Sequence, residues 1–469
     1  MASAWRNVFR RTSPLFQCLL SALCVGLTAG IYIALSALGA GGGRPNSQHL
    51  ADIAQSTLVA SALFSGLGAG ILLNKLGPTF CTVIGGIGYP VYVGGYWYFG
   101  ENGKLAYPIA GAVILGATCT LIQSSMSYIS IAYAEERHKG VYVGASLVVG
   151  YTLSCLASII PLAIDATNPD ADSVPVPVYG TFVALMGCAV IMGCFVLPPG
   201  KIKRDDGTAI ATIPVMTLKE AVVGAAKCLL DWRLLLLIPS MIAAEIHLPF
   251  MGVTNAFEFN GRARALNSFI ALLTSIPLNL FLGWLLDNKR WSRRARAYAG
   301  TLLVGVCIVA TFVPYVVELS SWSRAKDAFN YDWTKKGYAG DVIHFLIAWN
   351  FGSMMLNLST WYVGAMSNDP IVCANYSGLV RAMPCVGQAI IFGIDAAKIP
   401  YVGEAAATLV IYVVAVLGLL AFTYFCLEET RYFKEEHVIV PTYVLQNEGV
   451  EGIESVEVVS VTTPAQSEK

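Results

Sequence analysis

The feature that most constrains this chain is a series of long apolar segments. Five of them hold no Asp, Glu, Lys or Arg: 12–43, 53–73, 105–134, 141–164 and 405–427. A bilayer core about 30 Å thick is crossed by about 20 apolar helical residues. Because lipid offers the backbone no hydrogen-bond partners, such segments are expected to be helical. We therefore predict an all-α integral membrane protein, with the lipid bilayer as its surroundings.

The composition agrees and excludes several classes of function. Hydrophobic residues make up 56% of the 469 residues and charged residues 13%, whereas soluble proteins carry about 25% charged residues. The formal net charge is zero, so no nucleic-acid partner is expected. The twelve Cys lie mostly in apolar segments, and no CxxC pair or His/Cys cluster indicates a metal or cofactor. Without a Walker motif, a GxSxG in loop context or an HExxH, enzymatic activity is not expected.

Twelve membrane spans are predicted at 15–38, 54–74, 79–98, 107–133, 141–164, 178–197, 234–255, 266–286, 298–318, 342–364, 373–394 and 403–426. They fall into two six-helix halves, 15–197 and 232–426, which are joined by a polar central loop at 198–231. A short segment, 1–14, precedes the first half. The tail at 427–469 is polar and acidic, and we expect it to be mostly disordered.

Lys and Arg are distributed unevenly between the two sets of connecting loops. The richer set includes both ends of the chain and the central loop, and holds Arg6, Arg10, Arg11, Lys75, Arg137, Lys139, Lys201, Lys203, Arg204, Lys289, Arg290, Arg293, Arg294, Arg296, Arg431 and Lys434. The opposite loop at 165–173 holds three acids and no base, while 319–340 fits the pattern least well. Because basic loops stay in the cytosol, both termini are predicted to be cytosolic. The sequence does not distinguish the plasma membrane from an endomembrane.

A short motif recurs at corresponding places in the two halves. It reads Gly-x-x-x-Asn or Gly-x-x-x-Asp at the end of the second and eighth spans, 213 residues apart, with basic residues after it. Its members are Gly70, Asn74 and Lys75, then Gly283, Asp287, Arg293 and Arg294. The motif resembles the loop motif of the major facilitator superfamily. That resemblance implies a major facilitator fold of two pseudosymmetric halves around a midplane site, with the motif residues acting as a conformational latch.

Further segments resemble the UNC93-like branch of this superfamily, and fungal members in particular. In the order and spacing of that branch, they run through most of residues 25–400: 34–42, 74–78, 85–90, 134–140, 264–268, 367–370 and 375–378. Members of the branch usually carry Asn where this chain has Ala34 and Glu245. The branch includes proteins of undefined substrate and others that act as channel subunits or trafficking chaperones.

Glu245 is the first candidate for chemistry within the membrane. It lies in the apolar seventh span, with His247 two residues later. An ionised group at bilayer depth is costly and usually faces a cavity or a partner, so Glu245 is a candidate proton carrier. Residues two apart on a helix do not share a face, so Glu245 and His247 need not act as a pair. The alternative is a Glu in the outer half of the helix that touches water or an Arg.

Arg381 and Gln388 form a second group of candidates, in the eleventh span. Members of the UNC93-like branch have a basic residue at the position of Arg381. It could neutralise an anionic substrate or pair with an acid. The alternative is an Arg near the cytosolic end of the helix whose side chain extends to the membrane surface.

Polar positions on two other spans complete the candidate pathway. Asn350, Asn357 and Trp361 share one face of the tenth span, and Gln123 and Tyr128 lie on the fourth. The alternative is that these side chains bond neighbouring helices. Asn357 also begins a glycosylation sequon, as does Asn375, but neither is expected to be used. The first lies within a helix and the second on the predicted cytosolic side.

Two hypotheses follow for the function. The first is a secondary transporter that moves a small organic solute, such as a specialised metabolite, by alternating access of its two halves. The second is a non-transporting partner of another membrane protein, either a regulatory subunit or a trafficking factor. Flux that depends on Glu245 or Arg381 distinguishes the first from the second.

Overall fold

The computed structural model describes residues 10–37, 47–167, 176–204, 207–212, 217–324, 329–435, 437–441 and 444. Ten of its helical segments are long and apolar enough to cross a membrane. One of these, Ile53–Asn102, contains two spans, and the shorter apolar helix Pro177–Gly193 adds another. The twelve predicted spans therefore each coincide with a described helical segment. The first nine residues, 38–46, 168–175 and most of the tail beyond 441 lie outside the described residues.

The N-terminal half contains six spans. The first combines α2 (Pro14–Val25), the π-helical turn η1 (Gly26–Gly30) and α3 (Ile31–Ala37), and the others are α4 (Ser47–Asn102), α5 (Ala106–Ala132), α6 (Lys139–Thr167) and α7 (Val176–Gly193). α4 holds the second and third spans, which meet at Gly77 with φ of 78° and ψ of 170°. Only glycine adopts such a backbone without strain, so Gly77 permits the reversal between the two spans.

The C-terminal half repeats this arrangement. Its spans are α9 (Trp232–Ala243) with α10 (His247–Glu258), α11 (Gly261–Leu286), α12 (Arg293–Leu319), α13 (Tyr338–Met366), α14 (Pro370–Ala396) and α15 (Tyr401–Phe425). A further helix, α8 (Leu218–Leu229), lies in the central loop and begins with a capping box between Thr217 and Glu220.

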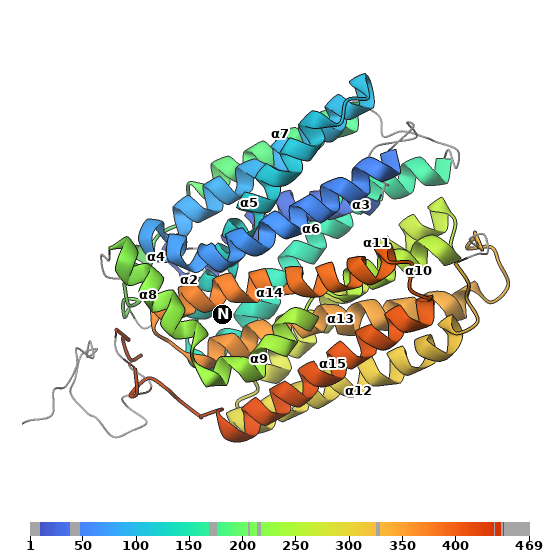
Figure 1. Cartoon of the computed structure of the whole chain (residues 1–469). Helices are drawn as coiled ribbons and strands as arrows, with labels where there is room; N and C mark the ends of the chain where they lie inside the picture. The colour runs from blue at the N-terminus through green and yellow to red at the C-terminus, as the bar shows by residue number, and fades with distance from the viewer. Residues whose placement is uncertain are drawn as a thin grey trace, which may run out of the picture.

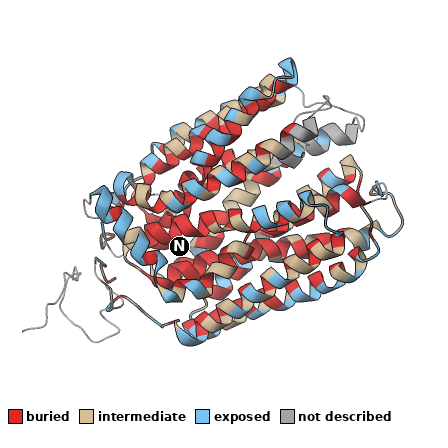
Figure 2. Cartoon of the chain, in the orientation of Figure 1, coloured by how far each residue is buried: buried red, intermediate tan, exposed pale blue. Residues whose placement is uncertain are grey.

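The two halves lie side by side and converge at one end of the molecule (Figure 1). We call this end the terminal face, because it carries the start of α2, the central loop and the segment after α15. The other end is called the opposite face. Buried residues are concentrated where the halves converge (Figure 2). In the contact between the halves, α4 packs against α14 and α6 packs against α11.

The first part of the tail differs from the expected disorder. Residues 427–435 and 437–441, which we call the C-terminal strap, run across the terminal face and bury Tyr432, Val438 and Val440 together. The carbonyl of Ile439 accepts a hydrogen bond of 3.0 Å from Arg204 in the central loop. Burial of these three apolar side chains stabilises the strap, although the acidic composition of the tail as a whole predicts disorder.

Candidate functional site between the two halves

The seventh span is interrupted at its centre. α9 ends at Ala243 and α10 begins at His247, so the three residues between them form a turn. Pro249 explains the interruption, because its ring lacks an N–H and clashes with the carbonyl four residues earlier, that of Glu245. That carbonyl accepts a 3.1 Å bond from the amide of Leu248 instead. The interruption places an acidic side chain at the midpoint of the span.

Glu245 faces α14 of the same half. Its Oε2 accepts a 2.9 Å hydrogen bond from Gln388 Nε2, and its Oε1 lies 3.9 Å from Arg381 Nη1. Arg381 Nε in turn donates a 2.8 Å bond to Ser127 Oγ on α5 of the other half. This buried arginine therefore joins an acid of the C-terminal half to a hydroxyl of the N-terminal half. A buried charge such as that of Arg381 is costly unless its hydrogen bonds are satisfied, which favours a functional reason for keeping it.

Three aromatic and amide side chains extend this polar layer in the N-terminal half. Tyr89 and Tyr151 lie close enough to Arg381 to interact with its charge. Gln123 Nε2 lies 3.3 Å from the Tyr89 hydroxyl and donates to it. Tyr151 reaches Ser353 on α13. Side chains from α4, α5 and α6 thus meet side chains from α13 and α14 in one layer near the middle of the spans.

Space remains around the ion pair. The Glu245 side chain is 22% exposed although its span is surrounded by other helices, whereas Arg381 is 5% exposed. Arg381 uses its Nε for the hydrogen bond to Ser127, and its Nη1 lies beyond hydrogen-bond distance of Glu245. A guanidinium carries five N–H donors. The arginine can therefore offer donors to a further acceptor at this site.

The other predicted candidates lie apart from the ion pair. His247 is buried, and its ring meets Trp349 edge-on at 5.4 Å. Asn350 Nδ2 donates a 2.8 Å bond to Thr274 on α11, and Asn357 Nδ2 donates a 3.2 Å bond to Asn279 on the same helix. These two amides therefore join α13 to α11 within one half.

Trp361 and Tyr128 are also buried away from Glu245. Trp361 meets Tyr362 edge-to-face at 5.2 Å, and Tyr128 meets Tyr133 in the same way at 5.8 Å. The structure thus brings together Glu245, Arg381, Gln388 and Gln123, and places the remaining candidates in helix packing outside this group.

The repeated motif lies where the halves touch at the terminal face. In the α4–α14 contact, a Cβ built on Gly70 would lie 2.5 Å from the Cα of Asn375, so only glycine fits. Asn74 Nδ2 donates to Asn375 Oδ1 and to the carbonyl of Ile371, both at 3.2 Å. Lys75, which follows, is exposed.

The second copy of the motif forms the α6–α11 contact. A Cβ built on Gly283 would lie 2.7 Å from the carbonyl oxygen of Gly140. The Asp287 carboxylate accepts hydrogen bonds from the first-turn amides of α6, those of Gly140, at 2.8 Å, and Val141. Burial raises the pKa of Asp287 to about 7, although these amides lower it. A carboxylate at a helix N-terminus is favoured by the helix dipole.

Charged side chains add to this closure of the terminal face. Lys139 Nζ donates to the carbonyls of Gly364 and Ser367 at 2.6 and 3.0 Å, across the two halves. Arg293 Nη1 lies 3.3 Å from Glu136 Oε1. Burial alone would raise the pKa of Glu136, but the charges of Arg293 and Lys139 outweigh it and hold this pKa below its usual value.

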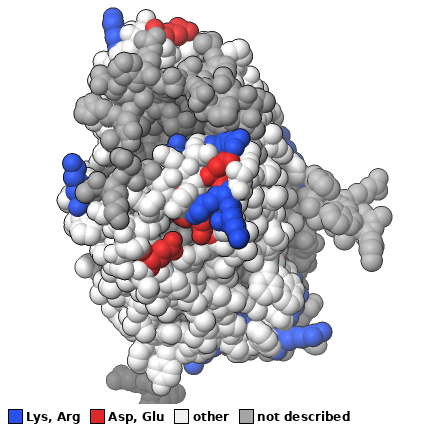
Figure 3. All heavy atoms as spheres, turned by 90° about the vertical axis from the view of Figure 1, so that its right-hand side faces the viewer, with Lys and Arg blue, Asp and Glu red and all other residues white. Residues whose placement is uncertain are grey.

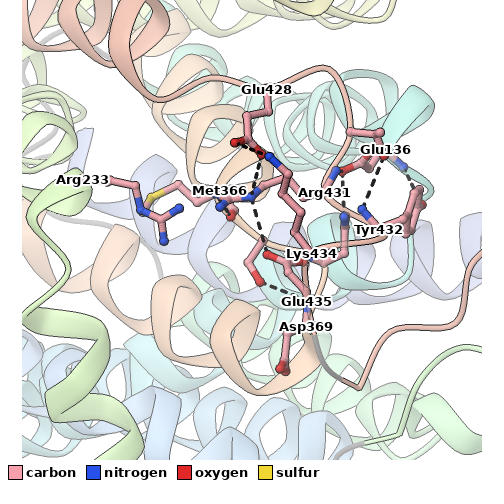
Figure 4. Close-up of polar contacts among 12 residues, drawn as sticks. Glu136, Arg233, Met366, Asp369, Glu428, Arg431, Tyr432, Lys434 and Glu435 are labelled. Carbon is pink, nitrogen blue, oxygen red and sulfur yellow. Dashed lines mark hydrogen bonds and ion pairs between the residues drawn. The ribbon is translucent and has the colours of Figure 1, made fainter. Parts of the chain in front are cut away.

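The C-terminal strap covers the same contacts (Figure 4). Arg431 donates from its Nη1 to the Met366 carbonyl at 2.7 Å and from its backbone amide to Glu136 at 3.1 Å. Glu435 accepts a 2.6 Å bond from the amide of Asn368. Arg294 Nε also donates to the carbonyl of Leu427, at the start of the strap. The strap therefore ties loops of both halves together.

The opposite face carries a different set of contacts. Basic and acidic side chains lie beside one another there (Figure 3). The ion pairs between described residues there, such as Arg262 with Asp332 and Arg324 with Asp395, lie within the C-terminal half. Among the residues that the structure describes, the polar contacts between the halves lie at the terminal face or in the middle layer. The halves are thus closed at one end by polar bonds that have no described counterpart at the other.

Comparison with known proteins identifies relatives along nearly the whole chain, although no family model matches. An uncharacterized membrane protein of Schizosaccharomyces pombe is 29% identical over 436 residues, covering 91% of this chain and 88% of its own length. An UNC93-like protein of the same yeast is 28% identical and covers 83% of this chain and 78% of its own. The Notoamide biosynthesis cluster protein O' of Aspergillus versicolor is 24% identical, with coverages of 83% and 84%.

Solved structures match the fold at low sequence identity. A structure of the proton-coupled fucose transporter of E. coli in the outward conformation aligns with this chain with a TM-score of 0.64 at 11% identity. It covers 87% of this chain and 98% of its own. A bacterial homologue of ferroportin in the outward-facing state aligns with a TM-score of 0.62 at 8% identity, covering 87% and 99%. The predicted major facilitator fold is confirmed.

Sequence reasoning missed some members of the polar layer. Ser127 lies four residues after Gln123 on α5, a spacing that shares a helix face, so this signal was available in the sequence. Tyr89 and Tyr151 lie among many tyrosines in apolar spans, and no pattern singles them out.

Proposed function

Because this chain belongs to the UNC93-like branch of the major facilitator superfamily, we propose that it moves a small organic solute between its two halves by alternating access. The solute binds in the middle layer, where Arg381 offers hydrogen-bond donors. The single observation that carries the proposal is the partly exposed ion pair of Glu245 and Arg381, which lies mid-membrane and contacts both halves.

The chemistry of the ion pair suggests the class of solute and its coupling. A solute with a carboxylate or a carbonyl group competes with Glu245 for Arg381, since both are acceptors for the same guanidinium. Glu245, once released, takes up a proton and carries it with the conformational change. Gln388 holds the carboxylate in the resting state through the 2.9 Å bond.

The state of the molecule supports this cycle. The polar closure at the terminal face corresponds to an outward-facing transporter, if that face is cytosolic as the distribution of Lys and Arg predicts. Neighbours described as outward-facing, at TM-scores of 0.64 and 0.62, support the same assignment. Inward opening then requires release of the α4–α14 and α6–α11 contacts and of the C-terminal strap.

The name of one relative narrows the solute. The Aspergillus versicolor relative is named for a biosynthesis cluster. A specialised metabolite exported by a fungal cell is therefore a suitable first class of solute to test. A regulatory role without transport is the competing function, and the names of the UNC93-like relatives leave it open.

Uptake into proteoliposomes under an imposed proton gradient tests the proposal with a panel of organic acids and amide-containing metabolites. We expect at least one solute to accumulate in response to the gradient. Glu245→Gln should abolish the dependence on the gradient, and Arg381→Ala should lower uptake at least tenfold. The matched control is Glu258→Gln, an acid of the same span that lies at the far end of α10.

The control should transport as the unchanged protein does. Absence of flux for every solute, together with a membrane protein that co-purifies at fixed ratio, would support the regulatory role and overturn the proposal. If the Glu245→Gln variant still transported with full dependence on the gradient, the transport function would stand, but Glu245 would not be the proton carrier.

A further inference from the structure

The short helix α8 has three chemically different sides. Ala221 and Cys228 are buried against the protein. Leu218, Val222 and Leu229 occupy the adjacent strip of the helix and are exposed by 53%, 46% and 46%. At about 100° per residue, Lys219, Glu220 and Lys227 lie on the remaining side. An apolar strip beside the protein contact, with charges beyond it, is typical of a helix lying in a membrane interface.

The position of α8 fits such an interface. α8 ends at Leu229 and the seventh span begins at Trp232, so its end lies at the membrane boundary. Trp232 and Leu235 of that span are 59% and 61% exposed and face the lipid. The apolar strip of α8 therefore continues a surface that the bilayer already covers.

A contact with the motif fixes α8 against the core of the terminal face. Asn375 Nδ2 donates a 3.7 Å bond to the Cys228 thiol, and the same Asn375 accepts from Asn74 in the α4–α14 contact. α8 packs against both α4 and α14. The helix is thus held in place at the junction of the two halves. Its apolar strip stays exposed, because the described residues of the chain do not cover it.

Charge completes the match to a lipid surface. Lys219 and Lys227 are exposed, and Lys75 is exposed on the neighbouring α4. None of the salt bridges between described residues uses these three lysines. Lysines beside an apolar strip attract the anionic headgroups of a cytosolic leaflet.

We propose that α8 is a membrane-surface helix that inserts Leu218, Val222 and Leu229 into the cytosolic leaflet and binds anionic lipid headgroups through Lys219 and Lys227. This role does not depend on transport, because it follows from the amphipathic strip, the lipid-facing start of α9 and the unpaired lysines. Through Cys228 and Asn375, the lipid-bound helix also supports the closed α4–α14 contact.

Quenching by lipid tests the proposal on the full chain in nanodiscs. The exposed Cys188 and Cys194 are first replaced by Ser. Val222→Cys is then labelled with an environment-sensitive fluorophore, and brominated phosphatidylcholine serves as the quencher, with or without phosphatidylserine. The matched control is Val223→Cys, which is equally exposed at 44% but lies about 100° further round the helix.

We expect brominated lipid to quench the label at position 222 several-fold more than the label at 223, and aqueous iodide to do the reverse. Phosphatidylserine should strengthen the difference, and Lys219→Gln combined with Lys227→Gln should remove that strengthening. Equal quenching at both positions would overturn the proposal. So would a label at 222 that is shielded only when a second membrane protein co-purifies.

Discussion

The two contacts that close the terminal face share a backbone design but differ in chemistry. In both, a glycine of one half lies against the backbone of the other, at Gly70 and at Gly283. The α4–α14 contact then uses neutral amides, from Asn74 to Asn375. The α6–α11 contact instead places the Asp287 carboxylate on the amides at the N-terminus of α6.

Only the α6–α11 contact depends on charge. An amide pair loses little when salt or pH changes, whereas a buried carboxylate depends on its protonation and on nearby arginines. Burial already raises the pKa of Asp287 to about 7. The two halves therefore meet through one neutral contact and one charged contact, related by the internal repeat.

Filling the glycine positions should have the largest effect. Gly283→Leu and Gly70→Leu both force backbone apart, because the atoms in the way belong to main chain or Cα rather than to flexible side chains. We expect each change to destabilise the closed protein by about 3 kcal/mol. Thermal unfolding in detergent measures this. Gly68→Leu is the matched control, since no atom lies within 4 Å of a Cβ built there.

An unfolding temperature that falls as far for Gly68→Leu as for Gly70→Leu would show that the loss is general to α4. A loss confined to Gly70→Leu and Gly283→Leu supports the close approach of the halves.

Removing the carboxylate should have the next largest effect. Asp287→Ala leaves the two α6 amides without their acceptor, at a cost of about 1–3 kcal/mol. Asp287→Asn keeps an acceptor oxygen for one of these two amides but turns an N–H donor group toward the other, so we expect only part of the stability to return. Unfolding of the two variants side by side measures the difference. If Asn restored all of the stability that Ala loses, the contact would not depend on both carboxylate oxygens.

Truncating the neutral contact should have the smallest effect. Asn74→Ala removes the bonds to Asn375 and Ile371, and polar contacts between membrane helices average about 0.6 kcal/mol. The same unfolding measurement should therefore show a smaller loss than for Asp287→Ala. A larger loss would reverse the order of the two contacts.

Much of the fold can be predicted from the sequence, because apolar segments in lipid must be helical. The repeat of Gly70 and Gly283 likewise predicts where the halves meet. The polar layer can be predicted only in part. Glu245 and Arg381 are 136 residues apart, and nothing in their local patterns shows that the turn before Pro249 aims one at the other.

The order of the C-terminal strap cannot be predicted from the sequence, for a different reason. Its acidic composition predicts disorder, while Tyr432, Val438 and Val440 are too few and too widely spaced to form a periodic pattern. Its order depends on partners far away in the sequence, such as Glu136 and Arg204.

Distances between spin labels test the central claim, alternating access of two halves, most directly. One pair at Lys75 and Lys289 spans the halves at the terminal face, and another at Lys104 and Lys398 spans them at the opposite face; all four side chains are exposed. In the unchanged protein, we expect a short terminal-face distance as the main population. In Asp287→Ala, a longer terminal-face distance should gain population together with a shorter opposite-face distance. If each pair gave one distance that stayed the same in Asp287→Ala, alternating access of the two halves would be contradicted.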